Sequence, residues 1–448
     1  MWHLSWTWIR DRLTLDQWLS TSTPSTLRKD VAAGLTVGVM LIPQAMAYAV
    51  IAGLPPIYGL YGALVPLLVY PLFATSRQLA IGPQALDMLI LAAGLTTVVE
   101  AGTGAYVGMA IVVTAMVGLL QIAMGAMQLG FVANLLSRPV IAGLTSAAAL
   151  IISFSQLGNL LGVDLGNSQY VHVLLWRALQ HLGEVHLISL GIGAVGIALL
   201  LALPRWAPAV PGSLVVVALA TAASYALAFE ARGVAVVGAI PDGLPPFRLP
   251  SLSLDTLNTL LPAAVTLALV QFMKNVSLGR VFATRHGYTI DANRELVGLG
   301  SANLVGAFFS SIPVSGSFSR SAVNDQTGAQ TPLANWFTAG VIALTLLFLT
   351  PLFYYLPLPA LAAIIIVAGI GLIDLRELQS LFKARRRDGY IALFTATCTL
   401  LIGIQEGILL GIGASVIAVL FRISRPNMAE LGHVPGTRLF RDLDRFDQ

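Results

Sequence analysis

Apolar segments long enough to cross a lipid bilayer recur along the whole chain. A membrane-spanning helix needs about 20 mostly apolar residues. Two shorter stretches, about 79–98 and 311–330, are interrupted by polar residues. Counted with the uninterrupted runs, they predict fourteen membrane segments and therefore an all-α polytopic membrane protein. The uninterrupted runs begin near Val31, Gly62, Val107, Val140, Leu187, Ala209, Leu257, Leu296, Leu333, Leu358, Ile391 and Ile408.

The composition agrees with a chain that is largely covered by lipid. Of the 448 residues, 56% are hydrophobic and only 10% are charged, and the mean hydropathy is +0.82. A soluble domain typically carries about 25% charged residues. Because so few charges cannot cover a water-soluble surface of this size, much of the surface must face the bilayer.

The sequence lacks the residues that several classes of protein function require. The single cysteine, Cys398, lies in an apolar run, which excludes a disulfide framework and a cysteine-based metal site. The six histidines are scattered, and no nucleotide-binding or catalytic motif is present. The basic triplet at 385–387 indicates a cytoplasmic anchor. The sequence therefore predicts no enzyme, no metal, no cofactor and no nucleic-acid partner.

Basic residues predict the orientation of the chain. If both termini are cytoplasmic and the chain crosses fourteen times, only Arg177, Arg232 and Arg248 fall outside. Lys274 and Arg320 fall within the membrane, and the other twenty of the 25 basic residues fall inside. This asymmetry is what the positive-inside rule requires. We therefore expect a multi-pass protein of the cell membrane with both termini in the cytoplasm.

The ends of the chain differ from its middle. Residues 1–30 are amphipathic and rich in tryptophan, without the apolar core and cleavage site of a signal peptide. They predict a short cytoplasmic helix on the membrane surface. The transport domain is expected at 31–424, and 425–448 is expected to form a cytoplasmic linker.

The two interrupted stretches occupy matching places in two halves of the chain. Each is third in a set of seven segments, at about 31–230 and about 256–424. Short segments broken by Gly or Pro at corresponding positions are typical of inverted repeats with a site at the bilayer midplane. Because each half has an odd number of crossings, the repeats run in opposite senses. We therefore expect a 7+7 inverted repeat.

Each interrupted stretch is expected to hold an extended piece followed by a half-helix that starts at the midplane. Pro83 fits the first turn of one half-helix, and Ser315, Ser317 and Ser319 offer capping hydroxyls near the start of the other. Two facing helix starts, with the added charge of Arg320, form an anion site without a metal. The alternative is a pair of ordinary kinked helices whose polar residues satisfy one another.

The first segment adds a second group of polar residues. Gln44 and Tyr48 lie four residues apart, so they share one helix face. An amide and a phenol on one face suit the wall of a polar site. The alternative is a glutamine bonded to the carbonyl of a neighbouring helix.

Two long stretches resemble a known family. The runs LIPQAMAYAVIAGLPPIYGLYGALVPLLVYPLFATSRQLAIGP (41–83) and GYTIDANRELVGLGSANLVGAFFSSIPVSGSFSRSAVN (287–324) closely resemble the signatures of the sulfate permease (SulP) family. The resemblance implies the fourteen-segment inverted repeat shared with nucleobase–ascorbate transporters. It implies a core domain (segments 1–4 and 8–11) that moves against a gate domain (segments 5–7 and 12–14). It also implies a homodimer that carries sulfate, bicarbonate, chloride, oxalate or small dicarboxylates. The substrate pocket that it implies consists of Gln44, Tyr48, Gln84, Ala85, Ser317, Ser319 and Arg320.

The sequence departs from the family pattern in two respects. Family members normally continue into a cytoplasmic STAS domain, and the linker 425–448 resembles the approach to that domain. In addition, Lys274 stands where many members carry an acidic residue for cation or proton coupling, and Asp87 is acidic where an apolar or hydroxyl residue is expected. We expect Asp87 and Lys274 to form an ion pair in place of a coupling ion. Alternatively, Lys274 is a second anion ligand.

These observations predict secondary active transport of small anions, by symport or antiport, through alternating access of core against gate. Protons are a candidate co-substrate. The alternative from another functional class is an anion channel or a voltage-dependent protein like prestin, which shares the fold implied by the resemblance. Saturable flux at low rate supports a carrier, whereas unitary currents support a channel.

Overall fold

The computed structural model describes most of residues 22–404 and parts of both ends of the chain. Within that range it leaves out 97, 100, 102, 135–137, 167, 169, 208–209, 240–242, 251–253 and 372. Beyond it, the described residues are 13–14, 17–18, 20, 406–407, 410–411, 413–415, 417, 431–433 and 440–442. Most of the predicted surface helix, of the segment from Ile408 and of the linker 425–448 therefore lies outside the described residues.

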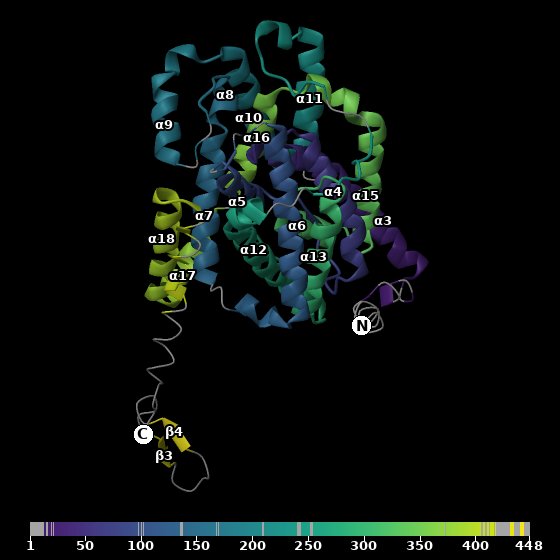
Figure 1. The fold of residues 1–448 in the computed structure, drawn as a ribbon, viewed down its shortest axis with the longest axis vertical. Coiled ribbons are helices and arrows are strands. Elements are labelled where there is room, and N and C mark those ends of the chain that lie inside the picture. Colours follow the sequence, from purple (N-terminus) through teal and green to yellow (C-terminus); the bar gives the residue numbers. More distant parts are fainter. Residues whose placement is uncertain are drawn as a thin grey trace.

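The described first half consists of helices joined by short loops (Figure 1). In chain order they are α3 (Pro24–Ile51), α4 (Ile57–Val69), α5 (Ala85–Leu95), α6 (Gly104–Ala126), α7 (Arg138–Ser155), α8 (Leu157–Leu161), α9 (Val171–Gln180), α10 (Leu187–Trp206) and α11 (Gly212–Leu227). A two-residue strand, β1 (Ile81–Gly82), comes just before α5.

The second half has a related order of elements. Its helices are α12 (Leu254–His286), α13 (Ala292–Ala307), α14 (Phe318–Gln326), α15 (Ala334–Leu344), α16 (Leu358–Ile370), α17 (Leu375–Ala384) and α18 (Arg386–Leu401). Strand β2 (Ser315–Gly316) comes just before α14, as β1 comes before α5. A hairpin of β3 (Leu431–His433) and β4 (Phe440–Asp442) follows at the C-terminal end.

The lengths and the hydropathy of the helices are those of a helical membrane protein. Among the described residues, seven helices are long and apolar enough to cross a bilayer. Three shorter apolar helices, Ile57–Leu72, Ala85–Leu95 and Gly212–Leu227, accompany them. Mean hydropathy in the long helices reaches 2.4, which is far too apolar for helices in contact with water. The prediction of an all-α membrane protein is confirmed.

The first long helix begins earlier than the apolar run predicts. The run starts near Val31, but α3 starts at Pro24. Thr23 caps the helix: its Oγ1 accepts a hydrogen bond from Thr26 N, and Thr26 Oγ1 accepts one from Thr23 N. A capping box and a proline in the first turn favour helix initiation even in a polar sequence. The helix therefore extends beyond its apolar part.

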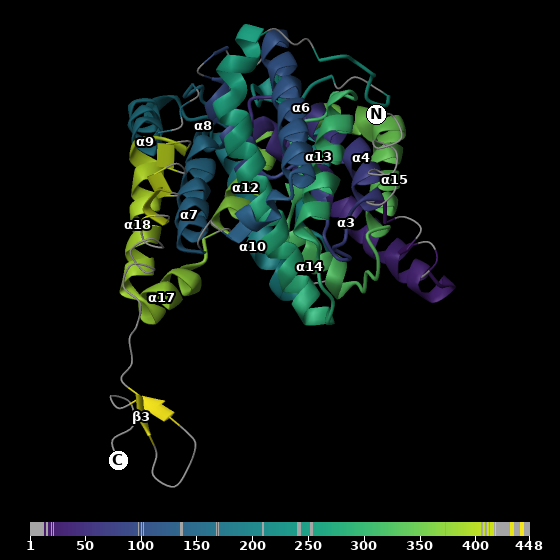
Figure 2. The same ribbon diagram turned by 60° about the horizontal axis from the view of Figure 1, so that its bottom comes forward.

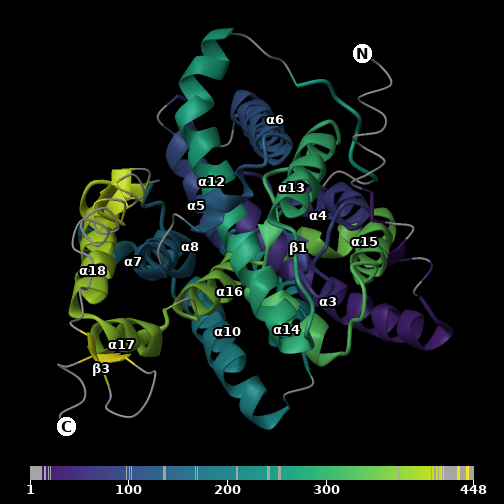
Figure 3. The same cartoon turned by 90° about the horizontal axis from the view of Figure 1, so that it is seen from below.

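The two short strands pair with each other in the interior. They are antiparallel, with Ile81 opposite Gly316 and Gly82 opposite Ser315, and β1 lies near the middle of the helices (Figure 3). Irregular backbone is tolerated at membrane depth only where protein satisfies its hydrogen bonds. Side chains do so here: Asn335 Nδ2 donates to Leu79 O at 3.0 Å, and Ser321 Oγ accepts from Ala80 N at 2.9 Å.

The long helices pack in pairs that correspond between the halves. α3 packs on α15 as α12 packs on α6, and α4 packs on α15 as α13 packs on α6. A second group pairs α7 with α18 and α10 with α16. Figures 1 and 2 show α7 and α18 at one side of the molecule and α4, α13 and α15 at the other.

The pairing of α6 with α13 depends on small residues. A Cβ at Gly118 of α6 would lie 2.4 Å from Leu304 N of α13, and one at Gly300 would lie 2.7 Å from Gly118 O. Real Cβ atoms do not approach backbone this closely, so a larger residue at either position would force α6 and α13 apart. Glycine therefore permits the backbone contact, as small residues do between other membrane helices.

Candidate anion site

Two short helices begin in the interior, each directly after one of the paired strands. α5 has Gln84 as its N-cap and α14 has Ser317. Ser317 Oγ accepts a hydrogen bond from Arg320 N at 3.4 Å. The first N–H groups of a helix lack intrahelical partners, and the helix dipole makes this end positive. The strand pairing thus brings two positive helix ends close together.

The predicted start of α5 was wrong in detail, whereas the predicted capping of the second half-helix by a serine is confirmed for Ser317. Pro83 precedes the N-cap of α5 and does not lie in its first turn, because Gln84 in an extended conformation begins the helix instead. Of the three serines, only Ser317 caps α14. Ser315 lies in β2 and donates to Asp87 Oδ2 at 2.5 Å, while Ser319 lies within the first turn.

Arg320 is the dominant charge at these helix starts. The residue is 0% exposed. Its Nη2 donates to Pro83 O at 3.2 Å, and its Nη1 makes a long contact of 3.4 Å to Gln44 Oε1. Its Nε has no hydrogen-bond partner. Among the described residues, no carboxylate forms an ion pair with this guanidinium.

Gly82 makes room for the guanidinium. Its φ of +147° is a conformation that residues with a side chain rarely adopt. A Cβ at this position would lie 3.2 Å from Arg320 Nη2 and 3.3 Å from Leu41 Cδ1. A side chain here would therefore crowd the buried arginine as well as strain the backbone.

The other predicted pocket residues lie on the elements around these helix starts. Gln44 and Tyr48 share the face of α3 that contacts Arg320 through the Gln44 amide, and Tyr48 is buried. Ala85 is the buried first residue of α5. Ser317 Oγ lies 3.2 Å from Ser319 Oγ, and Ser319 is exposed. The structure thus places Gln44, Ser317, Ser319 and Arg320 in one connected group.

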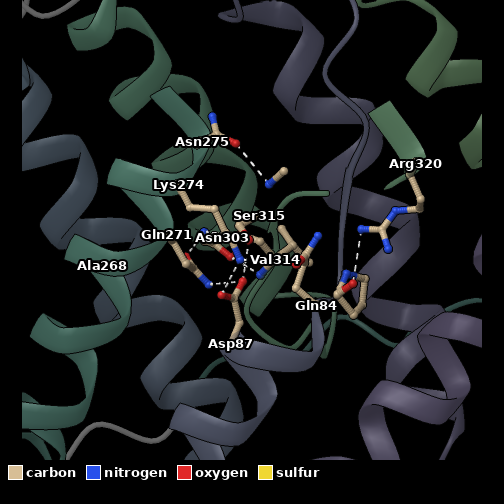
Figure 4. A network of polar contacts seen from close by, with 12 residues as sticks. Gln84, Asp87, Ala268, Gln271, Lys274, Asn275, Asn303, Val314, Ser315 and Arg320 are labelled. Carbon is tan, nitrogen blue, oxygen red and sulfur yellow. Dashed lines mark hydrogen bonds and ion pairs between the residues drawn. The ribbon is translucent and has the colours of Figure 1, made fainter. Parts of the chain in front are cut away.

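Asp87 and Lys274 lie together on the other side of Gln84. Lys274 Nζ is 2.8 Å from Asp87 Oδ1, with the two side chains 18% and 0% exposed. The ammonium also makes a long contact of 3.4 Å to Gln84 Oε1. Ser315 Oγ and Gln271 Nε2 donate to Asp87 Oδ2. In Figure 4 the side chains of Lys274 and Gln271 converge on Asp87.

A buried amide network supports this ion pair. Gln271 Oε1 accepts from Gln121 Nε2 at 3.1 Å and from Asn303 Nδ2 at 3.3 Å. Asn303 also bonds both backbone groups of Val314, which precedes β2 (Figure 4). Sequence reasoning missed Gln121, Gln271 and Asn303. A polar amide in each of three predicted membrane segments was the available signal, because such groups need partners.

The chemistry available here is anion binding. Among residues within the described ranges, no three His, Cys, Asp or Glu side chains gather as a metal site would require. What the site does offer is one unpaired guanidinium, serine hydroxyls, amides and two positive helix ends. These are donors, and donors recognise anions.

Comparisons with known proteins agree with this chemistry. The model of the sulfate permease family matches residues 27–395. Sulfate transporter 4.1 (chloroplastic) of Arabidopsis thaliana is 37% identical, over 98% of this chain and 65% of that protein. A probable sulfate transporter of Mycobacterium tuberculosis is 37% identical, over 94% of this chain and 75% of that protein. The chain thus spans roughly two thirds to three quarters of the length of these relatives.

A solved structure shows that the fold is shared. The murine Solute Carrier 26 family member A9 anion transporter, in its inward-facing state, superposes with a TM-score of 0.89 at 24% identity. The match covers 98% of this chain and 76% of that one. With a family model that covers most of the sequence, and relatives at 37% identity, the chain belongs to the sulfate permease family.

Proposed function

We propose that the protein is a secondary transporter of small anions, which bind between the starts of α5 and α14. The observation that carries the proposal is Arg320: a guanidinium that is 0% exposed, with an Nε that no described group accepts from. Burying a charge is costly unless it is paired. An incoming anion would supply the missing negative charge, so the site is suited to binding one.

The charges around Arg320 favour an anion there over a fixed counterion. Asp87 is the acidic residue of the network, and it is engaged by Lys274, Ser315 and Gln271. Lys274 is neutralised by the same contact. Arg320 and the two helix ends are left as the net positive charge of the site.

The anion class follows from size and donor type. The donors are small and polar: the Ser317 and Ser319 hydroxyls, the Gln44 and Gln84 amides and the backbone N–H groups of two helix starts. They suit a compact oxyanion or halide such as sulfate, bicarbonate or chloride, or one carboxylate of a small dicarboxylate. The relatives at 37% identity are named as sulfate transporters, so sulfate is the first anion to test.

We further propose a 7+7 inverted repeat with repeat one at about 31–230 and repeat two at about 256–424. The corresponding helix pairs support it, because the proposed repeat would exchange α3–α15 with α12–α6, and α4–α15 with α13–α6, and all four pairs are in contact. The antiparallel pairing of β1 with β2 is what the same relation requires of the third segments. With the distribution of basic residues, this gives fourteen crossings and cytoplasmic termini in the cell membrane.

Transport is proposed to move a core domain against a gate domain. In this assignment the core includes α3–α6 and α12–α15, which carry every predicted pocket residue, and the gate includes α7, α10, α11, α16 and α18. Contacts between the two groups run mainly through α3 with α11 and α16, and through α5 with α7. Displacement of the core at these contacts would carry the site from one side of the membrane to the other.

We propose that the Asp87–Lys274 pair replaces a coupling cation. The ammonium lies 2.8 Å from the carboxylate at a place that is almost closed to solvent. With the ammonium in this position, the carboxylate is already paired and has no free charge to bind a sodium ion. On this account the protein does not use a sodium gradient.

The test is anion flux in liposomes containing the purified protein. We expect saturable uptake of at least one of sulfate, bicarbonate, chloride and fumarate, and none of a nucleobase. Counterflow, in which internal unlabelled anion accelerates uptake of labelled anion, would identify an exchanger. The absence of flux for every anion would refute the proposal. Unitary currents instead of saturable flux would identify an anion channel or a prestin-like protein.

A further inference from the structure

Another buried carboxylate contacts α12 beside the site and has no cationic partner among the described residues. Glu295, in the first turn of α13, is 0% exposed and forms no ion pair there. Its Oε1 accepts from Thr75 N at 2.8 Å, Thr75 Oγ1 at 2.7 Å and Ser76 N at 2.8 Å. Its Oε2 accepts from Tyr70 OH at 2.6 Å and from Asn275 Nδ2 at 3.2 Å. The carboxylate is thus held by five donors.

Asn275 connects this carboxylate to the anion site. It lies on α12 next to Lys274 and is 0% exposed. While its Nδ2 donates to Glu295, its Oδ1 accepts from Gly316 N at 3.0 Å. Gly316 belongs to β2, and the next residue, Ser317, caps α14. Figure 4 shows the bond from Asn275 to the backbone that precedes α14.

The orientation of the Asn275 amide is determined by its two neighbours. An asparagine amide has a donor end and an acceptor end. Glu295 accepts, so the NH2 end must face it, and the oxygen must then face the Gly316 N–H. The approach is close: a Cβ on Gly316 would lie 2.7 Å from Asn275 Oδ1. A reversed amide would place two donors against each other at β2.

We propose that Glu295 and Asn275 are positioning residues for the anion site. The carboxylate orients the Asn275 amide, the amide holds Gly316, and Gly316 fixes where Ser317 and Arg320 lie. This inference rests on the proposed anion site, because the position of α14 affects function only if the anion binds at the start of that helix. Neighbouring residues of α12 thereby hold both half-helices: Lys274 contacts Asp87 of α5, and Asn275 contacts the strand before α14.

The test is a pair of complementary substitutions. Glu295→Gln keeps the shape but replaces one carboxylate oxygen by an NH2 group. Because three donors from Thr75 and Ser76 hold the remaining oxygen, the NH2 group faces Asn275, whose amide must turn and release Gly316. The double variant Glu295→Gln/Asn275→Asp restores an acceptor toward both the introduced NH2 group and the Gly316 N–H.

The first measurement is hydrogen–deuterium exchange of the peptide that spans 313–319. We expect faster exchange in Glu295→Gln than in the wild type and recovery in the double variant. Tyr70→Phe is the matched control, because it removes one donor from the same carboxylate oxygen without reversing Asn275. It should lower thermal stability and leave exchange at 313–319 unchanged. Unchanged exchange in Glu295→Gln, or equal acceleration in Tyr70→Phe, would show that Glu295 does not hold Gly316 in place through Asn275.

The second measurement is the dissociation constant of sulfate, determined by calorimetry on the same four proteins. Glu295→Gln should weaken binding about tenfold, the equivalent of one displaced hydrogen bond at the site. The double variant should return to within about threefold, and Tyr70→Phe should bind as the wild type does. Altered exchange with unchanged sulfate affinity would overturn the positioning role. If the wild type binds none of sulfate, bicarbonate, chloride and fumarate, the proposed function fails, while the exchange measurement still decides whether Glu295 and Asn275 hold Gly316 in place.

Discussion

The Asp87–Lys274 pair gives the sharpest prediction about stability. Removing one partner strands the other, and for buried pairs this costs about 3–5 kcal/mol. The two single changes should not be equal, because Asp87 is 0% exposed and the Lys274 side chain is 18% exposed. A stranded ammonium can move its charge toward solvent along a flexible stem, whereas the carboxylate cannot move.

The structure allows the two costs to be ranked. Lys274→Met leaves the Asp87 carboxylate with two neutral donors, Ser315 and Gln271, so we expect a loss in the upper part of that range, about 4 kcal/mol. Asp87→Asn leaves a partly exposed ammonium that still reaches Gln84 at 3.4 Å. Here we expect about 1.5–3 kcal/mol, the range for one hydrogen bond to a charged group.

The assay is the free energy of unfolding in mixed micelles, obtained by titration with a denaturing detergent. The charge-reversed double variant Asp87→Lys/Lys274→Asp is compared with its own single changes, Asp87→Lys and Lys274→Asp. The coupling energy of this cycle should exceed about 1 kcal/mol, above the roughly 0.3–0.5 kcal/mol expected of independent sites. Recovery will be incomplete, because Ser315 and Gln271 were arranged for a carboxylate at position 87. If each single variant is as stable as the wild type, or if the changes are additive, the pair does not stabilise the fold.

Three further predictions concern coupling, topology and motion. Because Lys274 occupies the place of a coupling cation, an inward sodium gradient should leave the initial rate of anion uptake unchanged, and a gradient-driven increase would contradict this. In a Cys398→Ser background, cysteine at 177 should be labelled by a membrane-impermeant reagent only from outside and cysteine at 386 only from inside; the reverse pattern would refute the orientation. A disulfide between α3 and α16, which are in contact, should arrest transport reversibly, and undiminished flux in the oxidised sample would argue for a fixed site.

Local patterns in the sequence were enough to locate the two interrupted segments. Prolines, glycines and serines within apolar sequence indicate where a membrane helix must break, and the structure has β1–α5 and β2–α14 there. The same patterns placed Pro83 in the first turn of α5, which begins at Ala85, and did not decide which of three serines caps α14. Capping depends on backbone conformation and on distant partners as well as on residue type: Ser315 bonds Asp87, which is far away in the sequence.

Contacts between distant segments could be predicted from the sequence only where opposite charges indicated them. Asp87 and Lys274 have opposite signs at membrane depth, so each was expected to seek the other, and the structure places them 2.8 Å apart. Neutral amides carry no such sign. Gln121, Gln271 and Asn303 could not be matched to each other from the sequence, and neither could Asn275 and Glu295. Their pairing depends on how α6, α12 and α13 pack.

Sulfate binding by the wild type and by Arg320→Ala decides whether the anion binds at Arg320. The guanidinium should supply a charge-assisted hydrogen bond worth about 1.5–3 kcal/mol, so its loss should weaken binding about 10- to 150-fold. Arg376→Ala is the charge-matched control, because Arg376 is exposed on α17, and it should bind as the wild type does. If Arg320→Ala retains the wild-type dissociation constant, Arg320 is structural and the anion does not bind between the starts of α5 and α14.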